Sequence, residues 1–110
     1  MKYKFNSIIW NNLKQGKGLM YRKGNDTYCA WGRAAKSCGI DCLGADVTDF
    51  YKDIAGTTGI DWIIVANDDG EFDKANRMLF EKLLASGKVE FDTIPEVLAN
   101  GYKEKETTSV

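Results

Sequence analysis

Residues 72–85 carry the clearest helical periodicity of the chain, and a helix of this kind has to bury one of its faces. Apolar side chains recur along one face, and two more widen the stripe: Phe72, Ala75, Leu79 and Leu83, then Phe80 and Leu84. Charged side chains cover the opposite face: Asp73, Lys74, Arg77, Glu81 and Lys82. The stripe needs a core to pack against, and 110 residues suffice for one such core in a single domain.

Shorter patterns predict the elements around this helix. Three further helices are expected where apolar or small side chains repeat with a helical period and glycines follow: residues 3–15, 29–39 and 45–56. Two aromatic-rich runs flank the Lys-Gly-Asn-Asp sequence at residues 23–26, which predicts a β-hairpin. Residues 61–66 are typical of a strand by composition, although a buried turn before the main helix fits as well. Residues 88–92 predict another short strand.

Together these patterns predict an α+β fold: a compact single domain, helix-dominated, with one β-hairpin and a short extra strand. The globular domain is expected to cover residues 1–101, with a last helical turn over residues 93–100. Residues 102–110 are polar and predict a flexible tail. The C-terminal sequence Thr-Thr-Ser-Val also fits a PDZ ligand, in which Thr108 and Val110 would enter the binding groove.

Four acidic residues lie within the seven positions of the sequence Asn-Asp-Asp-Gly-Glu-Phe-Asp: Asp68, Asp69, Glu71 and Asp73. One interpretation is a helix start, with Asp68 as N-cap, Glu71 completing a capping box, and the other two acids favourable at the positive end of the helix dipole. The alternative is a ligand or metal site built from the same four side chains. A calcium loop of the EF-hand type does not fit, because Val65 and Asn76 would fall at its two anchoring positions.

The chain contains no histidine, which excludes histidine-based nucleophilic pairs, general bases and zinc sites. Its three cysteines, Cys29, Cys38 and Cys42, lack the fourth ligand of a structural zinc site and predict reduced thiols used as small hydrophobic side chains. No phosphate-binding loop or dinucleotide fingerprint is present. We therefore expect no catalytic residue, no metal and no cofactor.

Charge and hydropathy narrow the choice of partner. Fifteen basic and 16 acidic residues give a net charge of −1, without the basic excess typical of nucleic-acid binding. Two interpretations fit the cations near the hairpin, Lys14, Lys17, Arg22 and Lys23. One is a local basic patch, and the other is a solvated rim of the hairpin. No run approaches the ~20 apolar residues of a membrane span. We expect a soluble, cytoplasmic protein whose partner is a protein, not nucleic acid or a membrane.

Four aromatic residues stand close together around the first helix and the hairpin: Trp10, Tyr21, Tyr28 and Trp31. They suit a hydrophobic core. If partly exposed, they would instead form a protein-binding patch or a stacking surface.

Two segments resemble a known family. The first is the sequence around Cys29 and Gly32, and the second is the Asn67-Asp68 pair that precedes the main helix. They are similar to a Cys-x-x-Gly-Ala-Leu helix and a Trp-Asn-Asp turn in a family of small uncharacterised proteins from phages and actinobacteria. Arg33 and Ala34 replace the Ala-Leu pair of the first motif, and Ala66 replaces the tryptophan of the second. The resemblance implies a small accessory protein of a phage or mobile element.

The function predicted from these features is a small non-enzymatic protein-binding or accessory protein, acting on a host protein. The alternative is a carboxylate-based ligand binder or metal-dependent enzyme that uses the loop from Asp68 to Asp73. The two hypotheses make opposite demands on the structure: an exposed apolar patch for the first, and convergent acidic side chains in a pocket for the second.

Overall fold

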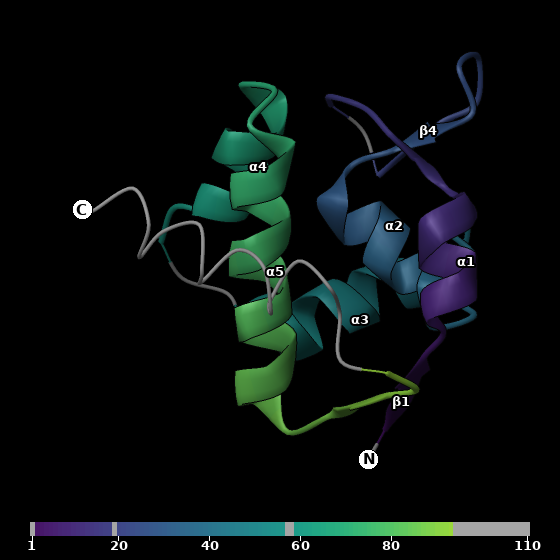
Figure 1. Ribbon diagram of the computed structural model, residues 1–110, viewed down its shortest axis with the longest axis vertical. Coiled ribbons are helices and arrows are strands. Elements are labelled where there is room, and N and C mark those ends of the chain that lie inside the picture. Colours follow the sequence, from purple (N-terminus) through teal and green to yellow (C-terminus); the bar gives the residue numbers. More distant parts are fainter. Residues whose placement is uncertain (1, 19, 57–58, 94–110) are drawn as a thin grey trace.

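The structure is a computed structural model that describes residues 2–18, 20–56 and 59–93, and in these ranges it has five helices and two small β-sheets (Figure 1). In chain order the elements are β1 (Tyr3–Phe5), α1 (Ser7–Asn12), β2 (Lys14–Gln15), β3 (Tyr21–Arg22), β4 (Thr27–Tyr28), α2 (Ala30–Ser37), α3 (Asp46–Ala55), α4 (Trp62–Asp68), α5 (Phe72–Ser86) and β5 (Val89–Phe91). The predicted class, a helix-dominated α+β domain, is confirmed. The helical turn predicted up to residue 100 and the tail with Thr108 and Val110 lie outside the described residues.

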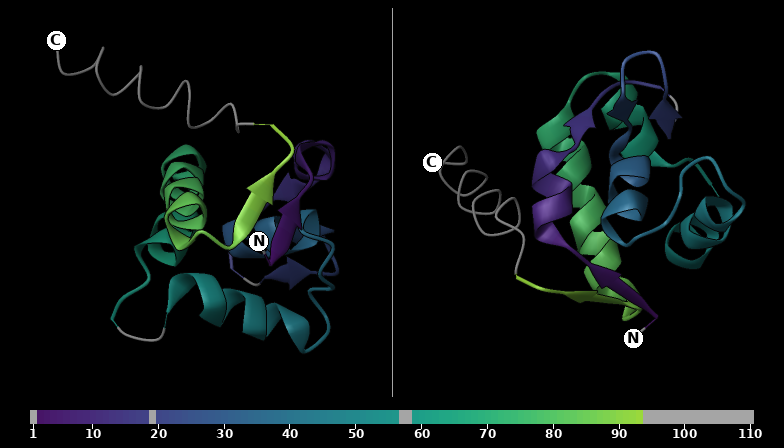
Figure 2. Two further views of the ribbon diagram at one scale, coloured as in Figure 1. Left: turned by 90° about the horizontal axis from the view of Figure 1, so that it is seen from below. Right: turned by 90° about the vertical axis from the view of Figure 1, so that its right-hand side faces the viewer.

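The two sheets lie at opposite ends of the molecule, with helices between them (Figures 1 and 2). β1 and β5 pair in parallel, with Tyr3 opposite Val89, so the first strand lies beside the last described one. The other sheet has the order β2-β4-β3, in which β2 is parallel and β3 antiparallel to the central strand. β3 and β4 are the predicted hairpin. α5 runs along the molecule from one sheet to the other (Figure 2).

The core is built on the buried face of α5, as its apolar stripe predicts. Leu79 and Phe80 are fully buried. The ring of Phe80 meets Phe5 and Trp10 in edge-to-face contacts with centroid distances of 5.5 and 4.8 Å, which join α5 to β1 and α1. Each buried side chain of this size contributes about 1.5–3 kcal/mol. Leu84, which the pattern assigned to the edge of the stripe, is instead about half exposed.

α2 packs closely against the hairpin because it contains Gly32. A Cβ atom at this position would lie 1.8 Å from the backbone oxygen of Met20. Ala34 and Ala35 are also fully buried, which agrees with the expectation that the small residues of this helix allow close packing. Any larger side chain at residue 32 would push the helix away from the strand connection.

Residues 62–66 lie in α4, so the strand predicted for residues 61–66 is wrong. Asp61 is the N-cap of α4: its Oδ1 accepts hydrogen bonds from the amides of Ile63 (2.9 Å) and Ile64 (3.2 Å). Gly70, with a φ of 83°, takes the left-handed conformation common just after a helix. These caps outweigh the strand preference of the β-branched residues between them.

The start of α1 and the capping of α5 differ from the predictions. α1 begins at Ser7, because the side chain of Asn6 caps it and the preceding residues pair with β5. α5 begins at Phe72, and Glu71 in its N-cap position makes no side-chain capping hydrogen bond. The capping box is therefore wrong, since Asp68 is the last residue of α4.

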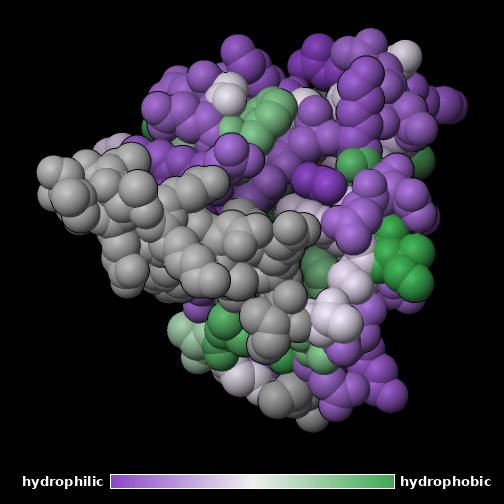
Figure 3. All heavy atoms as spheres, in the orientation of Figure 1, coloured by the Kyte–Doolittle hydropathy of each residue, from purple (hydrophilic) through white to green (hydrophobic). Residues whose placement is uncertain are grey.

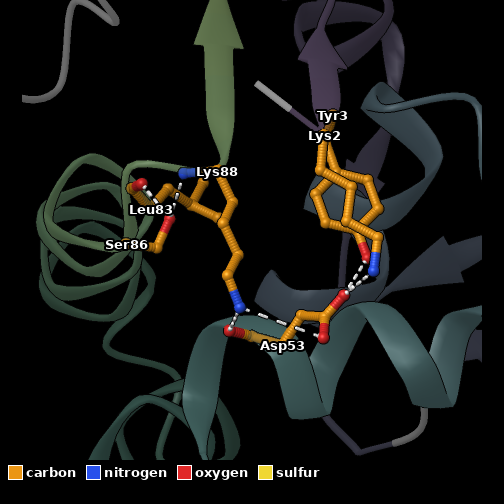
Figure 4. Close-up of polar contacts among 6 residues, drawn as sticks. All are labelled: Lys2, Tyr3, Asp53, Leu83, Ser86 and Lys88. Carbon is orange, nitrogen blue, oxygen red and sulfur yellow. Dashed lines mark hydrogen bonds and ion pairs between the residues drawn. The ribbon is translucent and has the colours of Figure 1, made fainter.

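Asp53 holds α3 against the β1–β5 sheet (Figure 4). Its carboxylate accepts hydrogen bonds from the ammonium group of Lys2 (2.6 Å) and from the hydroxyl of Tyr3. The ammonium group of Lys88 lies 4.0 Å from its other oxygen and donates to the backbone carbonyl of Asp53 at 3.3 Å. The hydrogen bonds from Lys2 and Tyr3 hold the pKa of Asp53 below its ordinary value.

Candidate functional site

The four aromatic residues that suggested a binding patch are mostly buried and do not form one surface. Trp10, Tyr28 and Trp31 keep 8%, 9% and 1% of their surface exposed. The guanidinium group of Arg33 lies over the ring of Trp10, 3.9 Å from its centroid. Tyr21 is partly exposed and stacks on Tyr28, with ring centroids 4.7 Å apart. This burial counts against a partner-binding surface made of these side chains.

The four acidic residues at and around the connection from α4 to α5 are exposed, and their side chains share no hydrogen bond with one another. Asp68 accepts a hydrogen bond from the amide of Gly18 at 2.9 Å, and Glu71 forms an exposed ion pair with Lys74 at 3.7 Å. Asp69 and Asp73 are exposed as well. Across the described ranges, no group of three or more Asp, Glu, Cys or His side chains is arranged to hold a metal ion. The structure therefore does not bring these acids together.

Asp61 joins α2, α3 and α4 through four hydrogen bonds. Besides capping α4, it accepts hydrogen bonds on Oδ2 from the indole of Trp31 (2.9 Å) and the hydroxyl of Tyr51 (2.6 Å). Burial and the hydrogen bond to Asp61 raise the pKa of Tyr51 to about 12. The sequence contained a signal for Asp61, an aspartate directly before an apolar run, but the strand interpretation of that run concealed it.

Asn67 is the second polar residue that sequence reasoning did not assign correctly. Only 1% of its surface is exposed, and its side chain makes three hydrogen bonds. Oδ1 accepts from the amide of Ala30 (3.0 Å) and from Nε2 of Gln15 (2.7 Å), and Nδ2 donates to the carbonyl of Gly16 (3.0 Å). Asn67 thus holds the end of α4 against β2 and the start of α2.

Gln15 extends this network to α2 and α5. Its Oε1 accepts hydrogen bonds from Arg33 (3.0 Å) and from Nδ2 of Asn76 (2.9 Å). Arg33 also donates two hydrogen bonds, of 3.0 and 2.8 Å, to the carbonyl of Trp10, and burial lowers its pKa to about 10. In this way a two-residue strand without an apolar side chain is fixed by partly buried polar contacts.

The three cysteines are free thiols with little nucleophilic character. Burial raises the pKa of all three, to about 12 for Cys38 and about 11 for Cys42. Cys29 caps α2 by accepting from the amide of Gly32 at 3.4 Å. Because the thiolate is the reactive form, these environments favour structural roles at neutral pH.

Exposed apolar side chains concentrate at the start of α4. We call Ile60, Trp62, Ile64 and Val65 the α4 surface; Ile60 and Trp62 have 66% and 59% of their surface exposed. An open groove lies beside it, lined by Ile60, Trp62 and Ile63 and, from α5, by Met78, Glu81 and Lys82, with Asp61 also at its wall. An apolar surface with charged residues at its edge is typical of a protein-binding site.

The chain matches no protein-family model, no curated protein and no solved structure. None of the helices in the described part of the chain has the length and apolar character that a membrane crossing requires.

Proposed function

We propose that this chain is a non-enzymatic protein-binding factor that contacts its partner through the α4 surface. The observation that carries this proposal is the exposure of Trp62 at 59%, next to Ile60 at 66%. Leaving a tryptophan and three β-branched side chains in water is unfavourable by about 25 cal/mol per Å² of apolar area, and a partner that covers them recovers that free energy.

The composition of the α4 surface supports a protein as the partner. Tryptophan is enriched among the few residues that dominate binding energy at protein interfaces, and it acts best inside a ring of less important contacts. Ile60 and Val65 supply apolar neighbours, and Glu81 and Lys82 supply charged groups at the edge. The other exposed large apolar residues in the described part of the chain are Ile8 in α1, Leu43 in the connection between α2 and α3, and Leu84 in α5.

The resemblance to small phage proteins gives this proposal a context, in which the partner is a host protein and the chain a phage accessory factor in the cytoplasm. The competing hypothesis, a carboxylate-based ligand binder or enzyme, needs Asp68, Asp69, Glu71 and Asp73 to converge. Their separate, exposed positions give it no support.

The test is capture of the partner followed by an affinity measurement with matched variants. The tagged protein is incubated with lysate of the cell that makes it or of its host, and a protein recovered in stoichiometric amount is identified, purified and titrated by calorimetry. Trp62→Ser is expected to weaken this binding by at least about 30-fold, the effect of losing a dominant interface residue. Leu43→Ser removes an apolar side chain elsewhere that is even more exposed, at 71%, and is expected to leave the affinity unchanged.

Circular dichroism of both variants shows whether the fold is retained. Equal affinities of wild type, Trp62→Ser and Ile60→Ser for the captured protein would contradict the proposal. Failure to recover any protein in stoichiometric amount would also count against it.

A further inference from the structure

A basic groove crosses the β2-β4-β3 sheet, away from the α4 surface. It is lined by Lys14, Lys17, Arg22, Asn25 and Thr27, together with Gln15 and Gly16. The strand register places Lys14 and Arg22 on either side of Thr27, so a cation, a hydroxyl and a second cation form one row across the sheet. Figure 3 shows the strongly hydrophilic surface over this end of the molecule.

Thr27 provides a polar group that the fold itself does not use. Only 7% of its surface is exposed, yet within residues 2–18, 20–56 and 59–93 its hydroxyl makes no hydrogen bond. A hydroxyl that lines a groove and has no partner in the protein can donate a hydrogen bond to a ligand.

The floor of the basic groove is held rigidly. A Cβ atom at Gly16 would lie 2.8 Å from the side chain of Thr27, so only glycine allows β2 to approach β4 this closely. Gln15 and the carbonyl of Gly16 are fixed from behind by Asn67. Groups placed on such a base are already arranged for binding, which reduces the entropy lost when a ligand is bound.

The charges of the basic groove favour an anion of small size. In the described ranges, Lys14, Lys17 and Arg22 form no ion pair, and no carboxylate lines the groove. The ammonium group of Lys17 lies close to Gly70, in the acidic connection between α4 and α5, and a Cβ there would be 3.5 Å from Nζ. Because acidic residues border the groove on that side, it does not continue as the long basic track that nucleic acid needs.

We propose that the basic groove binds a small phosphate-bearing ligand. A pyrophosphate group would lie between Lys14, Lys17 and Arg22 and accept a hydrogen bond from the hydroxyl of Thr27. Arginine suits this role because its planar donors pair with phosphate oxygens in a bidentate manner, and the lysines add compact positive charge. The ligand is held by side chains, since the amides of Gly16 and Gly18 already donate to Tyr28 and Asp68.

The experiment is a titration of the full chain, followed by amide NMR spectra, with sodium pyrophosphate, ATP and a short thymidine oligonucleotide in separate arms. Pyrophosphate is expected to cause saturable shifts at residues 14–17 and 22–27. Lys14→Gln, Arg22→Gln and Thr27→Val are each expected to weaken binding about tenfold, the effect of one lost charge-assisted hydrogen bond. Two controls are expected to bind as the wild type does: Thr27→Ser, which keeps the hydroxyl, and Lys4→Gln, which removes an exposed charge from β1.

The separate titrations with pyrophosphate and with ATP distinguish a free phosphate chain from a nucleotide as the ligand. Equal affinities for pyrophosphate and ATP would support recognition of the phosphate chain alone, and tighter binding of ATP would support a nucleotide as the ligand. Three results would overturn the proposal: no saturable shift with either compound, binding of the oligonucleotide alone, or a loss in Lys4→Gln as large as in Arg22→Gln. The lysine and arginine variants keep the test decisive if Thr27→Val does not fold.

Discussion

Replacing Asn67 with alanine is expected to lower the free energy of unfolding by about 3–5 kcal/mol, because three polar groups lose their partner in the interior. These groups are the amide of Ala30, Nε2 of Gln15 and the carbonyl of Gly16. A domain of this size has a total stability of about 5–15 kcal/mol, so the variant is expected to be close to unfolding. Urea denaturation followed by circular dichroism measures the change.

Asn11→Ala is the matched control, since it makes the same chemical change at an exposed position of α1. It is expected to alter stability by less than about 0.5 kcal/mol. A similar, small loss in both variants would mean that the contacts of Asn67 do not hold β2 in place. The rigid floor of the basic groove would then lack its support.

Replacing Asp61 with alanine is expected to lower the free energy of unfolding by about 2–4 kcal/mol. Part of this loss is the N-cap of α4, and the rest comes from two donors that lose their acceptor, the hydroxyl of Tyr51 and the indole N–H of Trp31, a side chain that is 1% exposed. Thermal unfolding and urea titration both measure the effect.

Two further variants separate the contributions of Asp61. Tyr51→Phe removes only one of the four hydrogen bonds and is expected to cause a smaller loss than Asp61→Ala. Asp61→Asn can still cap α4 through Oδ1, but its amide group cannot accept from Trp31, so an intermediate loss is expected. If Asp61→Ala is no less stable than Tyr51→Phe, the joint role of Asp61 in capping and in binding Trp31 is wrong.

Asp61 also connects stability with the proposed function. It fixes the first turn of α4, and Trp62, the main residue of the α4 surface, stands directly after it. A variant of Asp61 is therefore expected to disturb partner binding as well as folding. For this reason Trp62→Ser, which changes an exposed side chain, is the better probe of function.

The sequence predicted the elements whose signal is local. α5 follows from its apolar stripe, and the hairpin follows from its turn residues, since both patterns depend on neighbours along the chain. α4 has only seven residues, too few for a periodic pattern to stand out, and its β-branched residues resemble a strand. The sequence does show Asp61 as a possible N-cap of α4. Recognising the helix would have required giving this one residue more weight than the β-branched composition of the residues that follow it.

The exposure of the aromatic residues depends on contacts between distant parts of the chain, and no local pattern reports it. Trp10 is covered by Arg33 and Phe80, which lie 23 and 70 positions away. Trp31 and Trp62 both stand in short apolar runs, yet one is buried and the other exposed. The contacts of Asn67 with Gln15 and Gly16 span more than 50 residues for the same reason, so the network behind β2 had no signal in the sequence.

The most direct test of the account is acrylamide quenching of tryptophan fluorescence in the wild type and in Trp62→Phe. The structure leaves Trp62 exposed and keeps Trp10 and Trp31 buried, so most of the quenching should come from residue 62. Trp62→Phe is expected to reduce the Stern–Volmer constant several-fold while the protein stays folded. An unchanged constant would mean that acrylamide reaches the other two tryptophans, and it would contradict the assignment of the exposed apolar surface to α4.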